Sequence, residues 1–188
     1  MSSDRQSESP SETPSELSLA TEARLRGAPL LDALEKHESG SRERGEAMGS
    51  YAFATGVALG LGRAGAELCR ETAKLCEIGL MYESDDPYLD GASLTLGAGV
   101  PSDVCDWILQ TRERYDGSGP QELEGTEIAI AARIARAAAS CARSLTKTAP
   151  GHADRLAAAV TALRAGAGSE FDPEVVKALA GVLESTRT

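Results

Sequence analysis

The chain has 188 residues, of which 41% are apolar but only 4% are aromatic, and its formal net charge is -10. This length suits one domain, and a core poor in aromatic side chains must be built from Leu, Val, Ile and Ala at close helix contacts. The negative charge argues against binding of nucleic-acid backbones or anionic membrane surfaces, because both require clustered Lys and Arg.

The first twenty residues are rich in Ser, Pro and Glu and show no apolar periodicity. This composition predicts a disordered tail over residues 1–20, followed by a single helical domain over residues 21–188. No secretory leader is recognisable, and no apolar run reaches the ~20 residues of a membrane span. We therefore expect a cytoplasmic protein whose four cysteines are reduced, buried thiols rather than a metal site.

Hydrophobic periodicity predicts six to seven helices and no strand. Helical spacing starts from Leu17, is clear from Leu25 to Leu34, and is expected to break near Gly27 and Pro29. The next expected helices cover residues 44–61, 66–81, 102–115 and 126–146, the last with Thr126 as its cap. A sixth carries Leu156, Val160 and Leu163 and ends at Gly166 or Gly168, and a seventh starts at Asp172 and Pro173. Residues 83–103, rich in Gly and Asp, are expected to form an irregular connection. The alanine-rich helix 126–146 suits the centre of a bundle, because its small side chains allow close neighbours.

Three motifs carry a resemblance to a known family. Residues 112–134 read RERYDGSGPQELEGTEIAIAARI, residues 163–179 read LRAGAGSEFDPEVVKAL, and residues 59–80 read LGLGRAGAELCRETAKLCEIGL. They resemble, respectively, the signature loop, the closing segment and the helix ending in the His-Asp motif of the HD-GYP family. These are bacterial phosphodiesterases of the HD superfamily that hydrolyse cyclic di-GMP. The resemblance spans residues 41–184 and implies an all-α, HD-domain-like helical bundle.

The positions aligned with the family's metal ligands carry other residue types. They are Arg44 for the first His, Cys76 and Glu77 for the His-Asp pair, Thr111 and Arg112 for the paired His before the loop, and Ala139 or Ser140 for the last Asp. Metal-assisted phosphodiester hydrolysis needs imidazole and carboxylate ligands that activate a water. The two histidines, His37 and His152, fall on none of these positions. The sequence therefore predicts a pseudoenzyme without metal or cofactor.

Arginine placement suggests what replaces the metals. Arg44, Glu77 and Arg112 are expected to form an ion cluster, the alternative being that both arginines point to solvent.

The glycine-rich loop is retained without this chemistry. Its residues are candidates for a docking surface: Arg114, Tyr115, Asp116, Gly117, Ser118, Gly119 and Pro120. The structural alternative is a tight turn, with Asp116 in an Asx turn and both glycines at positive φ.

The sequence favours a catalytically inactive HD-GYP-like module that acts in bacterial signalling through protein partners. Two alternatives remain. One is a receptor that binds cyclic di-GMP or another nucleotide without cleaving it, with arginines holding the phosphate. The other is a phosphodiesterase with a rearranged metal site. Neither nucleic acid nor membrane is expected as a partner, while weak cyclic di-GMP binding and a homodimer stay open.

Overall fold

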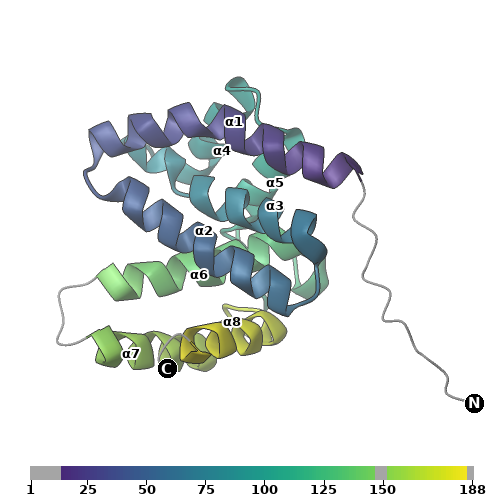
Figure 1. The fold of residues 1–188 in the computed structure, drawn as a ribbon, viewed down its shortest axis with the longest axis vertical. Helices are drawn as coiled ribbons and strands as arrows, with labels where there is room; N and C mark the ends of the chain where they lie inside the picture. The colour runs from purple at the N-terminus through teal and green to yellow at the C-terminus, as the bar shows by residue number, and fades with distance from the viewer. Residues whose placement is uncertain (1–13, 147–151, 186–188) are drawn as a thin grey trace, which may run out of the picture.

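The structure, a computed structural model, describes residues 14–146 and 152–185. These residues form eight α-helices and two short 3-10 helices, and none of them belongs to a β-strand (Figure 1). The elements are α1 (Pro14–His37), α2 (Ser41–Ala58), α3 (Gly62–Leu75), η1 (Ile78–Met81), α4 (Pro87–Gly97), α5 (Ser102–Gln110), η2 (Gly125–Glu127), α6 (Ile130–Thr146), α7 (His152–Ala165) and α8 (Pro173–Ser185). The prediction of an all-α bundle is confirmed. Within these described ranges, no helix is long and apolar enough to cross a membrane.

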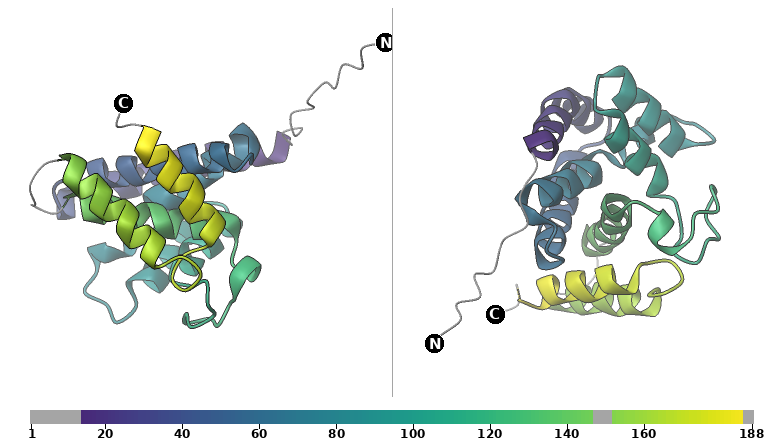
Figure 2. Two further views of the ribbon diagram at one scale, coloured as in Figure 1. Left: turned by 90° about the horizontal axis from the view of Figure 1, so that it is seen from below. Right: turned by 90° about the vertical axis from the view of Figure 1, so that its right-hand side faces the viewer.

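The centre of the bundle is α6, which packs against α2, α3, α5, α7 and α8. Figure 2 shows α6 between the layer of α2 and α3 and the pair formed by α7 and α8. Its buried face is mostly alanine, contributed by Ala131, Ala132, Ala135, Ala137, Ala138, Ala139 and Ala142. Small side chains let several helices approach one axis, so the predicted central position of this segment is confirmed.

The start of α6 differs from the prediction. Thr126 does not cap a long helix; instead the Glu124 and Glu127 side chains form a capping box around η2. Ile128 is then extended, with φ -73° and ψ 127°, so the α-helix can begin only at Ile130. The sequence does carry a helix cap here, but the cap belongs to the short 3-10 helix η2 and not to α6.

Helices α2 and α3 lie unusually close. Gly45, Gly49, Ala52 and Gly56 recur at helical spacing on α2 and are all buried. A Cβ atom added to Gly56 would lie 3.1 Å from the Cα atom of Ala66 on α3. Glycine at this position therefore sets the distance between the two helices.

Two hydrophobic clusters fill the interior. The larger surrounds α6 and joins α2, α3, α7 and α8, whereas the smaller lies under α1 and joins it to α3 and α5. Trp107 of α5, the only tryptophan in the chain, packs against both clusters. The indole ring therefore lies where the two clusters adjoin.

The four cysteines are free and buried, as predicted. Burial raises the pKa of Cys69, Cys76 and Cys141 to about 12. These side chains are therefore neutral thiols at pH 7 and serve as small apolar groups of the core.

The first helix is longer than the sequence suggested. It begins at Pro14, so residues 14–20, assigned above to the tail, are its first turns, and Ala20 is already buried. Proline at the first helical position needs no hydrogen-bond partner for its nitrogen, which favours a start there. Pro29 lies inside α1 without ending it, since Leu31 and Leu34 beyond it are buried in the smaller cluster. Residues 1–13 lie outside the described part of the chain.

Helix α4 was missed, because its Gly and Asp content resembles that of a connection. Asp86 caps it by accepting a hydrogen bond from the Leu89 backbone N–H at 3.1 Å, and Pro87 follows at the first helical position. Gly91 is there for space, since its added Cβ would lie 3.0 Å from the backbone nitrogen of Gly79. Gly79 and Gly91 therefore allow η1 and α4 to come into contact, and neither marks a turn.

Glu71 of α3 is a buried carboxyl group with 3% of its surface exposed. Burial raises its pKa, and Lys74, whose Nζ lies 3.8 Å from Glu71 Oε2, offsets only part of that effect. The folded state therefore holds this proton more tightly than the unfolded state does. The protonated Glu71 carboxyl therefore adds to the free energy of unfolding below the ordinary pKa of a glutamate. This contribution is lost as the pH rises through the raised pKa of the folded state.

We therefore expect Glu71→Gln to stabilise the protein at pH 7 and to change little at pH 4. The gain should be about 1.4 kcal/mol for each unit by which the pKa is raised. Urea unfolding at both pH values measures the difference, and an equal effect at both would contradict it.

Candidate functional site

Glu77, aligned with the Asp ligand of the HD-GYP motif, lies where three helices meet. It follows Cys76, the C-cap of α3, is 4% exposed and accepts hydrogen bonds from two guanidiniums. Arg44 of α2 donates from Nε to Oε2 at 2.8 Å, and Arg143 of α6 donates from Nη1 to Oε1 at 2.9 Å. Arg44 also makes a bidentate pair with Glu38, at 3.1 and 3.2 Å. Burial alone would lower the pKa of Arg44, but its hydrogen bonds to the two carboxylates raise it.

The expected ion cluster thus exists with a different third member. Arg44 and Glu77 pair as predicted, but the second arginine is Arg143. Arg112 lies with its Nη1 2.5 Å from Asp86 Oδ1 instead. The reason is α4, absent from the sequence prediction, whose capping residue Asp86 stands next to the end of α5 and takes this guanidinium.

A further arginine, Arg136 of α6, secures the end of α5. Its Nη1 donates to the carbonyl oxygens of Thr111 at 3.0 Å and of Arg112 at 3.2 Å, and its Nη2 donates to Glu170 Oε1 at 3.0 Å. The last carbonyls of a helix lack partners within the helix, so a cation there is favourable. Burial lowers the pKa of Arg136, and the charge of Glu170 opposes that effect.

Sequence reasoning missed Arg136 and Arg143, although one signal was available. The two residues are seven apart, which places them on one face of α6, a turn to either side of Ala139. Burial raises the pKa of Tyr88 of α4, and the nearby positive charges of Arg143 and Arg136 partly oppose that effect. The guanidinium of Arg112 lies 5.4 Å from the centre of the Tyr88 ring. Arginines from α2, α6 and the end of α5 therefore gather around the aligned ligand positions.

The remaining aligned positions offer no metal ligand. Cys76 Sγ donates to the Ala73 carbonyl oxygen at 3.2 Å, and a pKa of about 12 keeps it a thiol. Thr111 Oγ1 donates to the Ile108 carbonyl oxygen at 2.6 Å. Ala139 is buried in the core and carries no donor atom. Each of these side chains is occupied within its own helix or in the core.

These residues do not fit a metal centre. Both oxygens of Glu77 are taken by guanidiniums, whose charge would repel a cation. Among residues 14–146 and 152–185, no group of three or more His, Cys, Asp or Glu side chains is arranged to hold a metal ion. Ion pairs occupy the region instead, joining Arg44, Arg112, Arg136 and Arg143 to Glu38, Glu77, Asp86 and Glu170.

Glu77→Gln is expected to lower the free energy of unfolding by about 2 kcal/mol. This is less than the ~3–5 kcal/mol typical of a fully buried pair, since the Arg143 side chain is 47% exposed. Adding Arg44→Leu to Glu77→Leu should recover part of the loss, because two apolar groups can replace a buried ion pair at little cost. Urea unfolding of the single and double variants tests both statements. A double variant with a lower free energy of unfolding than either single variant would contradict them.

The loop after α5 forms the tight turn considered above. Asp116 Oδ1 accepts hydrogen bonds from Ser118 N at 3.1 Å and Ser118 Oγ at 2.6 Å, which is an Asx turn. Arg114 donates to Ser118 Oγ at 2.8 Å and to Asp116 Oδ2 at 3.3 Å, and Gly117 has a φ of +78°. The hydrogen bonds from Ser118 and Arg114 lower the pKa of Asp116 to about 2. The carboxylate is therefore ionised wherever the protein is folded near neutral pH.

Glu113 anchors the far side of this loop. It is 1% exposed, and its two carboxylate oxygens accept hydrogen bonds from the backbone N–H groups of Gln121 at 3.0 Å and Leu123 at 3.3 Å. Gly119 does not have the positive φ we expected. It provides room, since an added Cβ would lie 2.5 Å from Glu113 Oε2 and 2.8 Å from the Arg114 backbone nitrogen. Sequence reasoning did not single out Glu113.

The exposure of the loop is uneven. Asp116, Ser118 and Pro120 are exposed, whereas Arg114, Tyr115 and both glycines are half-buried. Because its polar groups are already bonded to one another, docking at residues 114–120 stays a prediction.

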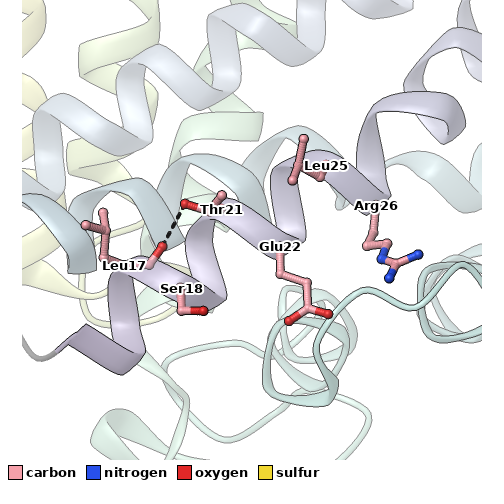
Figure 3. A pocket seen from close by; sticks show the side chains of 6 residues that line it. All are labelled: Leu17, Ser18, Thr21, Glu22, Leu25 and Arg26. Atoms are coloured by element: carbon pink, nitrogen blue, oxygen red, sulfur yellow. Dashed lines mark hydrogen bonds between the residues drawn. The ribbon is translucent and has the colours of Figure 1, made fainter.

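Exposed apolar side chains gather elsewhere, around α4. Seven large apolar side chains are exposed in the described part of the chain, and four of them lie within residues 80–96, namely Leu80, Tyr82, Leu89 and Leu96. A shallow groove beside α4 is lined by Tyr82, by Leu94 and Ala98 of α4, and by Leu30 of α1. A second groove follows the outer side of α1, where Leu17 and Leu25 flank Glu22 (Figure 3). The described surface therefore offers two stretches with exposed apolar side chains, one around α4 and one along α1.

The chain is similar to known proteins in part of its sequence and in its fold. Residues 89–175 match the HD domain family. Among solved structures, the fold is similar to a cyclic GMP-AMP-specific phosphodiesterase of V. cholerae, with a TM-score of 0.69 and 17% sequence identity over 88% of this chain and 49% of the other. The chain thus spans about half the length of that phosphodiesterase. No curated protein sequence matches it.

One prediction is contradicted by these findings. The sequence led us to expect a protein that is not an enzyme, yet the similar structure is that of a phosphodiesterase and HD domains are usually hydrolases. The residue types at the aligned ligand positions therefore do not by themselves exclude an enzymatic activity. The fold prediction is confirmed, because the all-α bundle is similar to the fold of that phosphodiesterase over 88% of this chain.

Proposed function

We propose that the chain is an HD-GYP-type module that acts in bacterial signalling by binding a protein partner. The subgroup is supported by two motifs whose geometry fits their sequence. The DGSG loop closes through Asp116, and in the GAGSEFDP segment Asp172 accepts a hydrogen bond from the Glu174 backbone N–H at 2.8 Å at the start of α8. The residues at the positions aligned with the metal ligands differ from those of that subgroup. Glu77, at one of these positions, forms ion pairs with Arg44 and Arg143.

The observation that carries this proposal is the apolar surface around α4. Leu89 and Leu96 are 51% and 57% exposed on a helix whose other side is packed against η1 and α5. Exposed apolar side chains scattered singly are ordinary, but four of them fall within one stretch of seventeen residues, a concentration that favours a protein contact.

A photo-activated cross-linker placed at Leu89 tests the proposal in the bacterium that encodes the chain. Val57 on α2 is the matched control, since it is apolar and 52% exposed but lies apart from the patch. We expect a discrete cross-linked protein from position 89 and none from position 57. A third probe at Ser118 examines the loop. Absence of any cross-linked protein at both 89 and 118 would overturn the proposal.

A nucleotide with a phosphodiester group is the second candidate ligand. It is favoured by the gathering of arginines, since the side chains of Arg112 and Arg143 are 30% and 47% exposed and a planar guanidinium matches a phosphate. The likeness to a cyclic GMP-AMP phosphodiesterase points to the same class of compound.

Calorimetry with cyclic GMP-AMP and cyclic di-GMP distinguishes this candidate. Binding that is weakened at least tenfold by Arg143→Ala would support it, and no heat from either nucleotide would remove it. The same mixtures, incubated with and without manganese and separated by chromatography, show whether a linear product forms. A metal-dependent product would favour the phosphodiesterase with a rearranged metal site.

A further inference from the structure

The outer side of α4 is flat at its middle. Ser93 and Gly97 are one turn apart there, and the Ser93 hydroxyl is turned back to donate to the Leu89 carbonyl oxygen at 2.8 Å. Beyond Gly97 there is open space, because no atom lies within 4 Å of the place a Cβ would take. Leu89 and Leu96, seven residues apart, project beside this flat strip.

Apolar side chains also line the other edge of the strip. The shallow groove there is lined by Leu94 and Ala98 of α4, by Tyr82 and by Leu30 of α1. We call the strip, its two flanking leucines and this groove the α4 face. Small residues between two apolar rows let the axis of another helix come close, and such a groove takes the apolar side of an amphipathic helix.

Negative charge predominates along the α4 face, although the Arg26 side chain lies next to Gly99, just past the C-terminal end of α4, where an added Cβ would lie 3.7 Å from Arg26 Nε. Glu83 and Asp90 line its groove, and Asp85 is exposed in the segment between them; in the part of the chain that the structure describes none of the three forms an ion pair. Asp86 differs, since Arg112 neutralises it. The groove along α1 has no such selectivity, because Glu22 and Arg26 both line it. An occupant of the α4 face therefore gains by carrying positive charge.

We infer that the α4 face binds a basic amphipathic helix of a partner protein. This inference rests on the proposed function and names the surface and the chemistry of the partner. Small or apolar side chains of that helix lie over Ser93 and Gly97, and its Lys or Arg side chains face Glu83 and Asp90. A second copy of this chain would set like carboxylates against each other, and an anionic membrane would be repelled by them.

Two synthetic helical peptides with one shared apolar face test the charge requirement. One has Lys and Arg on its polar face and the other has Glu, and fluorescence anisotropy measures their binding to the full chain. We expect the basic peptide to bind, the acidic peptide not to, and Glu83→Lys with Asp90→Lys to weaken binding at least tenfold. Asp103→Lys with Asp106→Lys, the same charge change on exposed positions of α5, should weaken it less than threefold. Equal losses in both double variants would mean non-specific attraction and would overturn the inference.

Gly97→Leu tests the shape requirement without disturbing the fold. Gly181 on α8 is the matched control, since a Cβ there also meets open space. Both variants should keep the wild-type circular dichroism and melting temperature, but only Gly97→Leu should reduce peptide binding at least tenfold. Unchanged binding by Gly97→Leu would show that the peptide does not lie on the α4 face.

Two further measurements separate the other occupants. Light scattering should give the same mass for wild type and Gly97→Leu, and a dimer lost only in the variant would assign the α4 face to a second copy. Sedimentation with phosphatidylserine vesicles should leave the chain in solution, and co-sedimentation would assign the face to a membrane. If position 89 cross-links a protein through a segment that is not a basic helix, the proposed function stands and this inference fails. If no position cross-links, the proposed function itself fails.

Discussion

Replacing Gly79 with alanine is expected to lower the free energy of unfolding by about 3 kcal/mol or more. The added Cβ would overlap the carbonyl oxygen of Pro87 and would lie 2.7 Å from the backbone nitrogen of Gly91. Both are backbone atoms of α4, so no side chain can swing away to relieve the overlap. The helix would have to move away from η1 as a unit. Urea unfolding followed by circular dichroism measures the loss.

Gly181→Ala is the control for this prediction. It makes the same change within α8, where the added Cβ meets nothing within 4 Å. Alanine favours a helix over glycine by about 0.8–1 kcal/mol, so this variant should be neutral or slightly stabilised. If both variants unfold at the same urea concentration, the close packing of η1 against α4 is wrong.

Glu113→Ala is expected to cost about 3 kcal/mol. The carboxylate accepts two backbone hydrogen bonds, and charge-assisted bonds contribute about 1.5–3 kcal/mol each. Its removal leaves the N–H groups of Gln121 and Leu123 without this acceptor, so these two amides should exchange with solvent much faster. Glu113→Gln keeps one acceptor oxygen and should lose about half as much. Slow exchange retained in the alanine variant would show that the loop does not depend on Glu113.

The fold was predictable where side-chain size repeats along one helix face. The alanines of α6 indicated a central helix, because only small side chains permit so many close neighbours. Helix α4 could not be recognised in the sequence, because glycine within it was read as a loop residue. Gly91 was taken as a sign of an irregular connection, whereas it and Gly79 each make room for the other's backbone. A glycine required by contact between distant segments looks in sequence like a glycine required by a turn.

The candidate site was predictable only in part, for a related reason. Arg44 and Glu77 could be paired because both were anchored to aligned positions. The partner of Arg112 could not be found, since Asp86 caps a helix that the sequence analysis had not recognised. Likewise, the buried side of the loop depends on Glu113, whose two bonds reach eight and ten residues ahead. Contacts over such distances leave no periodic pattern.

The position of Trp107 makes the chain its own reporter of cooperativity. With one indole packed against both clusters, intrinsic fluorescence is a single-site signal that senses hydration of either one. If the cluster under α1 loosens before the one around α6, the emission maximum shifts to the red while helical ellipticity is still largely retained. If the two melt together, fluorescence and ellipticity trace one superimposable transition, so an unlabelled sample suffices to decide whether α1 is a separable layer or an integral part of the domain.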